Sequence, residues 1–417
     1  MKRFTLLVAG SMLAASCATL PNADAPDTAE AEAPANPFAQ VPLGEGPWDL
    51  ETEKGAIHVE VLSRELERPW AIAFLPGGDM LVTERPGRLR LLRGGVLDPK
   101  PIEGLPPIYN AGIAGLMDIE LHPDFERNRL VYLTYSKFDP ENPQETTLAL
   151  LRARWDGGYQ LSDVEDIFVA HNWYGKPPMP EKCCGQGPPF GSYGGRIAFD
   201  AHGFLFLTSG DRNFGENVQD PATHFGKIFR LNDDGSVPEG NPFADREGWL
   251  PEIWTTGHRN PTGLVFDRET GRLWSTEFGP RGGDETNLIE PGRNYGWMDV
   301  TQGHHYDGTP AKGIRDVPGM VDPVIVWGPP SHNPGNLAVY RGSAFPAWEG
   351  DLLIAMMNKS LIRAEVDAQG RVTHQETLLT EPKQRLRDAS VGPDGNIYIL
   401  TDETEGALLK ISPGGAE

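Results

Sequence analysis

The chain has 417 residues, and 37 Lys and Arg against 59 Asp and Glu give it a formal net charge of −22. So acidic a chain is repelled by phosphates, which argues against nucleic acid or an anionic membrane surface as its partner. Its 49 glycines, 38 prolines and 39% hydrophobic residues favour many short strands joined by turns over long helices.

Residues 1–17 have the pattern of an export signal. A short basic start precedes an apolar run from Phe4 to Ala15, which is too short to span a bilayer as a mature helix. The run ends Leu-Ala-Ala-Ser-Cys17, which resembles the bacterial lipoprotein cleavage box with alanine where leucine is usual. We therefore expect an exported, periplasmic protein. Lipid attachment at Cys17 and ordinary cleavage a few residues further on both stay open.

Residues 18–46 are dominated by Ala, Pro, Asp and Glu, without large apolar groups at regular spacing. This composition predicts a disordered tether, because such a segment cannot bury enough apolar surface to fold. We expect residues 47–417 to form a single domain.

One template recurs through that domain: an apolar strand, a turn with Pro, Asp or Gly, a second apolar strand, then Thr or Ser with an acid. Its six copies are Trp70–Arg85, Met117–Ser136, Arg196–Arg212, Gly263–Gly279, Leu337–Ala355 and Ala389–Glu403. A lone hairpin cannot bury its apolar face, whereas four-stranded sheets stacked radially can. The repeat predicts an all-β, six-bladed β-propeller with four-stranded antiparallel blades. A pair of β-sandwiches is the alternative, but the spacing shows no break between two domains.

In a propeller the loops that follow the second strand of each copy emerge at one face, around the central channel. Arg259 and Asn260 directly precede a strand, where a guanidinium and an amide can be held toward an anion. Gly279 and Pro280 form a tight turn whose carbonyls can face a hard cation, and Glu285 follows shortly after.

Further cations lie at repeat boundaries, at Lys359, Arg385 and Arg387. Carboxylates accept bidentate hydrogen bonds from guanidinium groups and also coordinate calcium. Guanidinium groups that face a cation site therefore indicate a small polycarboxylate ligand.

Six segments carry a resemblance to a known family: GHRNPTGLVFD, EFGPRGGDETN, NYGW, the run from Arg385 to Asp388, PDGNIYILTDE and GLMDIELHPDF. Together they resemble the soluble quinoprotein glucose/sorbosone dehydrogenases, most closely the aldose sugar dehydrogenase branch. This resemblance implies a six-bladed propeller that binds pyrroloquinoline quinone (PQQ) and calcium. It also implies oxidation of aldoses or related alcohols, with electrons passed to an external acceptor.

The resemblance assigns roles to individual positions. The residues that it implies for cofactor binding are Arg259, Asn260, Tyr306, Ser331, Arg385 and Arg387, with Lys359 or its neighbour Asn358 in the place of a family lysine. The carbonyls of Gly279 and Pro280 match the ligands of the cofactor's calcium. Glu285 and the Tyr295 carbonyl match a second, structural calcium site.

The sequence differs from the family at positions to which the resemblance assigns catalytic or substrate-binding roles. The family's catalytic histidine is Ser192 here, and serine without a partner is no general base near neutral pH. A family glutamine is Ile113. Asp211 matches the acid that orients the histidine, so it is either the base itself or a turn residue. His171 and His332 are further candidates to replace the imidazole.

The insertion from Asn172 to Tyr193 carries the adjacent Cys183 and Cys184 just before the altered position. A disulfide between neighbouring cysteines makes a strained, rigid ring, which suggests a lid over the cofactor. Two free thiols, or a ring that merely stiffens the loop, are the alternatives.

The sequence leaves three functions to compare. The first is a PQQ- and calcium-dependent sugar dehydrogenase whose base is not the family histidine. The second is a catalytically silent propeller that binds a ligand or protein partner at the same face. The third, a lactonase-like hydrolase, has no need of the arginine pair.

Overall fold

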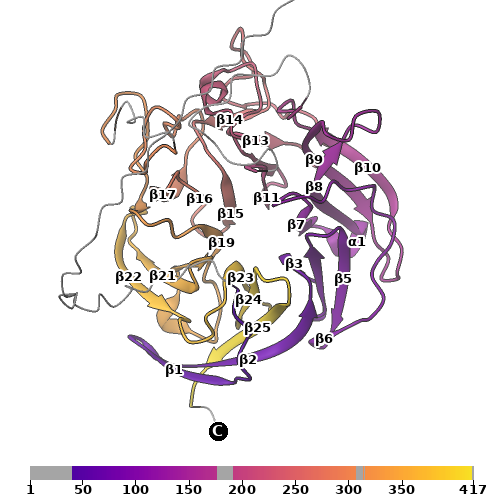
Figure 1. The fold of residues 1–417 in the computed structure, drawn as a ribbon, viewed down its shortest axis with the longest axis vertical. Coiled ribbons are helices and arrows are strands. Elements are labelled where there is room, and N and C mark those ends of the chain that lie inside the picture. The colour runs from indigo at the N-terminus through magenta and orange to yellow at the C-terminus, as the bar shows by residue number, and fades with distance from the viewer. Residues whose placement is uncertain (1–39, 176–190, 307–312, 314, 416–417) are drawn as a thin grey trace, which may run out of the picture. The chain divides into compact units, whose positions relative to one another are not determined.

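The computed structural model describes residues 40–175, 191–306, 313 and 315–415. Their strands form six antiparallel sheets, which follow one another around a common centre (Figure 1). The first strands of neighbouring sheets contact one another and lie nearest that centre (Figure 1). The prediction of a six-bladed β-propeller is therefore confirmed, and the pair of β-sandwiches is excluded.

Each sheet is one blade, numbered in chain order from the first template copy. Blade 1 has β3 (Pro69–Phe74), β4 (Met80–Glu84), β5 (Arg88–Arg93) and β6 (Val96–Leu97). Blade 2 has β7 (Leu116–Leu121), β8 (Leu130–Phe138), β9 (Thr146–Arg154) and β10 (Ser162–Val169). Blade 3 has β11 (Gly194–Phe199), β12 (Leu205–Ser209), β13 (Lys227–Leu231) and β14 (Ile253–Thr256).

The second half of the ring repeats this order. Blade 4 has β15 (Pro261–Asp267), β16 (Arg272–Glu277), β17 (Asp284–Ile289) and β18 (Ile325–Trp327). Blade 5 has β19 (Pro334–Val339), β20 (Leu352–Met356), β21 (Ser360–Val366) and β22 (Val372–Leu378). Blade 6 has β23 (Leu386–Val391), β24 (Ile397–Thr401), β25 (Gly406–Pro413), β2 (Gly55–Leu66) and β1 (Trp48–Thr52).

The six template copies are the two innermost strands of the six blades. These strands read as continuous apolar runs because neighbouring blades cover both of their faces, and β20 is buried at every position. The outermost strand β22 instead mixes exposed and buried residues. The apolar core accordingly lies between blades, and one cluster joins Trp70 of β3 through Leu133 of β8 to Leu207 of β12.

The ring is closed by strands from opposite ends of the chain. β2 pairs with β25, with Val59 opposite Ile411, so an N-terminal strand completes the last blade. β1 then pairs with β2 and gives blade 6 a fifth strand. The template did not predict this closure, because the two N-terminal strands lie outside the repeat.

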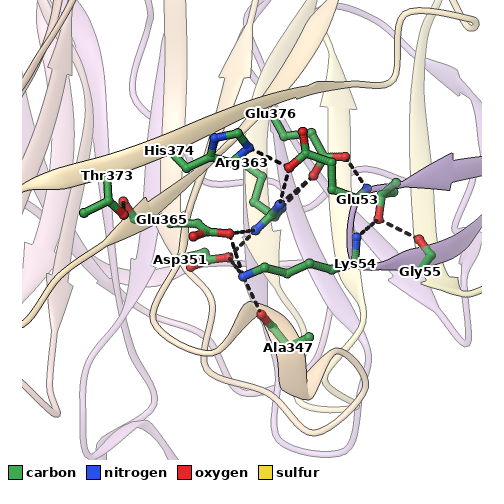
Figure 2. Close-up of polar contacts among 11 residues, drawn as sticks. Glu53, Lys54, Gly55, Ala347, Asp351, Arg363, Glu365, Thr373, His374 and Glu376 are labelled. Atoms are coloured by element: carbon green, nitrogen blue, oxygen red, sulfur yellow. Dashed lines mark hydrogen bonds and ion pairs between the residues drawn. The ribbon is translucent and has the colours of Figure 1, made fainter.

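The turn between β1 and β2 is fastened to blade 5 by an ion network around Arg363 (Figure 2). The buried Arg363 guanidinium on β21 lies 2.7 Å from carboxylate oxygens of both Asp351 and Glu376. From the turn, the Glu53 amide donates to Glu376 at 2.7 Å and Lys54 lies 2.8 Å from Glu365. We call this group, together with His374, the clasp cluster. It ties the closing blade to its neighbour.

Helices are minor in this fold. The described ones are α1 (Phe125–Asn128), η1 (Gly215–Gln219) and η2 (Pro346–Trp348). In the part of the chain that the structure describes, no helix is long and apolar enough to cross a bilayer.

The N-terminal predictions fall mostly on residues 1–39, outside the described ranges, and this includes Cys17. The last residues of the expected tether do contact the propeller. The Arg64 guanidinium donates to the carbonyls of Leu43, Gly44 and Glu45, and Gln384 donates to the Val41 carbonyl at 2.9 Å.

Candidate active site

A cavity of about 430 Å³ lies where the first strands of the blades begin. The loops that follow β4, β16 and β24 contribute Arg85, Phe278 and Asp402 to its wall. These residues are far apart in sequence, so the expected convergence of these loops is confirmed. Among the lining residues are four arginines and one acid: Arg68, Arg85, Arg385, Arg387 and Asp402. We call it the arginine cavity.

Asp402 holds two of these arginines together. Its Oδ2 accepts a hydrogen bond from Arg385 and its Oδ1 accepts one from Arg387, each at 2.7 Å. Burial by itself raises the pKa of Asp402, but the guanidinium groups of Arg387 and Arg385 outweigh burial and lower it to about 2. The carboxylate is therefore ionised at neutral pH, and it fixes the orientation of both arginines.

Arg259 and Asn260 lie at the same end of the blades. Asn260 lines the arginine cavity, and its Oδ1 accepts a hydrogen bond from the Gly194 amide at 3.1 Å. Arg259 is not itself a lining residue. Its Nη1 donates to the carbonyls of Phe278, which lines the cavity, and Gly279, at 3.1 and 3.2 Å. The two residues are thus close to the cavity, with Asn260 on its surface and Arg259 beside it.

Hydrogen bonds hold the Gly279–Pro280 turn in place. Asp284 pins it, because Oδ1 accepts from the Gly279 amide at 2.8 Å and Oδ2 accepts from the His332 amide at 2.5 Å. The Pro280 carbonyl accepts from the His304 amide at 2.7 Å. A Cβ on Gly279 would lie 2.2 Å from a backbone oxygen, so the turn has no room for a side chain.

Glu285 lies on β17, directly opposite Glu277 of β16. Burial raises the pKa of Glu285 well above its usual range, and the like charge of Glu277 adds to this effect. Tyr295 is buried with its ring stacked 4.8 Å from that of His258. No group of three or more His, Cys, Asp or Glu side chains in the described ranges is arranged to hold a metal. A cation here would therefore rely on backbone carbonyls together with Glu285.

The structure separates the remaining predicted cofactor residues from the arginine cavity. A second cavity of about 650 Å³ is lined by Arg281, His304, His305, Tyr306, Pro329, Pro330, Ser331 and Asn333. Tyr306 and Ser331 both line this second cavity, which we call the proline cavity. The Ser331 hydroxyl accepts a hydrogen bond from the Gly282 amide, just after the Gly279–Pro280 turn. Lys359 lines neither cavity; it lies in the turn after β20, where its neighbour Met357 lines the first.

Ser192 and Asp211, predicted from separate motifs, are brought together. Asp211 is fully buried, and its oxygens accept hydrogen bonds from the Asn213 amide at 2.9 Å and from the Trp297 indole at 2.8 Å. Burial raises the pKa of Asp211, while Arg259 and a hydrogen bond from Ser192 are among the interactions that oppose it. The buried Ser192 is not part of the cavity wall, although the next two residues are.

No histidine takes the place of the missing imidazole at the wall of the arginine cavity. All ten histidines lie in the described ranges, and none of them lines it. The ring of His171 lies 5.1 Å from that of His224, and His332 faces Trp327 and the Pro330 carbonyl. His305 is buried, with its ring 5.5 Å from that of Trp297, in the wall of the proline cavity.

Sequence reasoning missed Arg68 and Arg85 as site residues. The signal for Arg85 was present, because it ends the first template copy in the Thr-Glu-Arg loop. Arg68 precedes that copy and had no distinguishing pattern. Ile113, which the resemblance places where the family has glutamine, lines the arginine cavity and is 46% exposed. Cys183 and Cys184 lie outside the described residues, so their disulfide stays a prediction.

Fold and site together define a class: a six-bladed β-propeller with an arginine-lined cavity where its inner strands begin. The family model described as Glucose / Sorbosone dehydrogenase matches residues 66–410. The chain therefore belongs to this family of sugar dehydrogenases.

Individual relatives agree with this assignment. Aldose sugar dehydrogenase YliI of Escherichia coli is 38% identical, over 86% of this chain and 93% of the relative. Quinoprotein glucose dehydrogenase B of Acinetobacter calcoaceticus is 27% identical, over 89% of this chain and 91% of its own. A solved PQQ-bound aldose sugar dehydrogenase of Streptomyces coelicolor superposes with a TM-score of 0.67 at 26% identity, covering 85% and 98% of the two chains.

Proposed function

We propose that this protein is a PQQ- and calcium-dependent dehydrogenase of aldose sugars or related alcohols that acts in the periplasm and passes electrons to an external acceptor. One observation carries the proposal: the arginine cavity, in a member of a sugar dehydrogenase family, holds four guanidinium groups against a single carboxylate. Two relatives support the cofactor, since one is named a quinoprotein and another was solved with PQQ bound.

The residues present fit a polycarboxylate. The Nε atom of Arg85 is buried without a hydrogen-bond partner in the described chain, and such an atom favours an anionic ligand. Calcium fits the Gly279–Pro280 turn, because each carbonyl accepts one hydrogen bond from the protein and has a second lone pair to offer. Arg385 and Arg387, oriented by Asp402, would hold the cofactor's carboxylates. Gly279 and Pro280 would hold the metal.

When bound, PQQ supplies the acceptor for the two electrons that leave the substrate carbon as hydride. The protein must take the hydroxyl proton. We assign this proton to Asp211, which lies beside Ser192; Ser192 donates to Asn213 Oδ1 at 3.5 Å and directly precedes Tyr193 and Gly194 of the cavity wall. Burial raises the pKa of Asp211, which makes it a better proton acceptor than an exposed aspartate.

Reconstitution tests the proposal directly. The purified apoprotein is mixed with calcium and PQQ, quinone uptake is followed by fluorescence, and dye reduction is followed with a panel of aldoses and alcohols. We expect uptake together with substrate-dependent reduction. No uptake at all would remove the proposal. Fractionation of cells that express the chain with and without residues 1–17 tests its export.

A catalytically silent propeller is the second function to consider, because the resemblance places Ser192 at the position of the family's catalytic histidine and none of the ten histidines lines the cavity. It predicts a different result in the same experiment. Quinone uptake without reduction of the dye by any substrate of the panel favours the silent propeller over the enzyme.

A further inference from the structure

The arginine cavity contains a guanidinium group that the protein itself does not satisfy. Arg85 is 7% exposed and lines the cavity. Its side chain makes no hydrogen bond or ion pair with any residue in the described ranges, and its Nε is fully enclosed. A buried charge without a partner is costly, and it persists in a protein when something else supplies the partner.

The surroundings of Arg85 keep it cationic and short of negative charge. Burial lowers the pKa of Arg85 to about 10, with Arg387, Arg68 and Arg385 adding to the effect and Asp402 opposing it. A group with this pKa is still charged at neutral pH. Asp402 acts on Arg85 through space only, since its hydrogen bonds from arginine come from Arg385 and Arg387.

Backbone hydrogen bonds fix Arg85 next to Arg68. The Arg85 amide donates to the Arg68 carbonyl at 3.0 Å, and the Arg68 amide donates to the Glu403 carbonyl at 3.0 Å. The Arg85 carbonyl accepts from the Leu116 amide at 3.1 Å. The Arg68 guanidinium likewise makes no hydrogen bond or ion pair within the described chain. Two unpartnered guanidinium groups thus share one rigid edge of the cavity.

We propose that Arg85, with Arg68 beside it, is a carboxylate-binding residue of the arginine cavity, separate from the Arg385–Asp402–Arg387 group. A guanidinium binds a carboxylate by donating two parallel hydrogen bonds to its oxygens. Two guanidinium groups at one edge can together bind both oxygens of one carboxylate. The inference rests on the proposed function for the source of that carboxylate. It belongs either to the bound quinone or to an acidic sugar such as a uronate.

The test compares Arg85→Met with Arg93→Met. Methionine keeps the unbranched stem of arginine and removes its charge. Arg93 ends β5, its side chain is 51% exposed and it lines no part of the cavity, so the control makes the same change elsewhere in blade 1. We measure the apoprotein's unfolding midpoint, the Kd for PQQ with calcium, and KM for glucose and for glucuronate.

If the carboxylate belongs to the quinone, we expect Arg85→Met to raise the Kd for PQQ at least tenfold. If it belongs to the substrate, we expect an unchanged Kd for PQQ and at least a tenfold higher KM for glucuronate, with KM for glucose unchanged. In either case the apoprotein should unfold at the same temperature or higher, since an unpaired charge has been removed. Arg93→Met should stay within twofold throughout.

Unchanged binding of both PQQ and glucuronate by Arg85→Met would overturn the inference, and a lower unfolding midpoint beside it would make Arg85 a structural residue. Should Arg85→Met fail to fold, Arg85→Lys replaces it; lysine keeps the charge but loses the bidentate fork, so unchanged affinities for both ligands overturn the inference there too.

Failure of the proposed function is distinguishable from failure of the inference. If the wild-type protein takes up no PQQ, the rise in its unfolding temperature with citrate or glucuronate tests the carboxylate site on its own. Protection that Arg85→Met abolishes supports the carboxylate site without the quinone. A wild-type protein that neither carboxylate protects overturns it.

Discussion

The arginine of the clasp cluster and the arginines of the arginine cavity differ in how the protein balances their charge. In the clasp cluster one guanidinium, Arg363, meets carboxylates from Asp351, Glu365 and Glu376, and Glu53 lies 3.7 Å away (Figure 2). The arginine cavity is lined by four arginines and one acid, Asp402, which bonds only Arg385 and Arg387. The protein balances the charge of the first group by itself and leaves an excess of positive charge in the second. We therefore expect the first group to contribute mainly to stability and the second mainly to binding.

The largest effect should come from removing the centre of the clasp cluster. We expect Arg363→Met to lower the free energy of unfolding by about 3–5 kcal/mol, because buried carboxylates then lose their shared cation. Denaturant unfolding of the apoprotein measures it. The affinity of the folded fraction for PQQ should not change, and a loss of stability below about 1 kcal/mol would contradict this view of the cluster.

In the arginine cavity the same kind of change should affect binding more than stability. We expect Arg387→Ala to weaken PQQ binding by about 1.5–3 kcal/mol, the scale of a hydrogen bond to a charged group. Quinone titration of the apoprotein measures the effect. Arg371→Ala, on a side chain that is 75% exposed, is the control and should bind normally. Equal affinities of the two variants would remove Arg387 from the site.

Asp402, the single acid that lines the cavity, should make the free energy of unfolding depend on pH. The pKa of Asp402 falls from 3.8 to about 2 on folding, so its ionised form adds about 2 kcal/mol of stability above pH 4. That stability is lost as the pH falls from about 4 to 2. Asp402→Asn should be less stable at pH 7 and should lack this part of the acid transition. A variant with the same slope of unfolding free energy against pH in this window would argue that Asp402 is not the responsible group.

The smallest effect should be at the edge of the clasp cluster. Lys54 is 28% exposed and reaches Glu365 and Asp351 at 2.8 and 3.5 Å. Solvent screens such pairs, so Lys54→Met should cost about 0.2–1 kcal/mol in denaturant unfolding. A loss as large as that of Arg363→Met would show that the network acts as one unit, and the contrast between its centre and its edge would be wrong.

The sequence predicted the repeated part of this molecule well. Short apolar runs and turn residues are local signals, so six hairpins could be counted, and each became the inner half of a blade. The pairing of β2 with β25 could not be predicted in this way, because it joins segments about 350 residues apart that carry no template. For the same reason, the sequence did not predict that an N-terminal strand closes the ring.

The site was predicted where a motif marks it and missed where only geometry does. Asn260, Arg385 and Arg387 do line one cavity, as expected. Tyr306 and Ser331 were grouped with them by resemblance, but they lie across the Gly279–Pro280 turn in the proline cavity. Arg85 emerged as important only from its missing partners, and an absent hydrogen bond has no counterpart in a sequence.

The seam between β2 and β25 has a consequence for biosynthesis. The ribosome makes β2 among the first strands and β25 last, so blade 6 cannot be assembled until translation has reached Pro413. Until then β1 and β2 can pair with each other but not with the rest of blade 6, so the ring stays open. Ring closure is therefore a late event that joins the two ends of the chain, and a truncation that removes β25 would leave β2 without this partner.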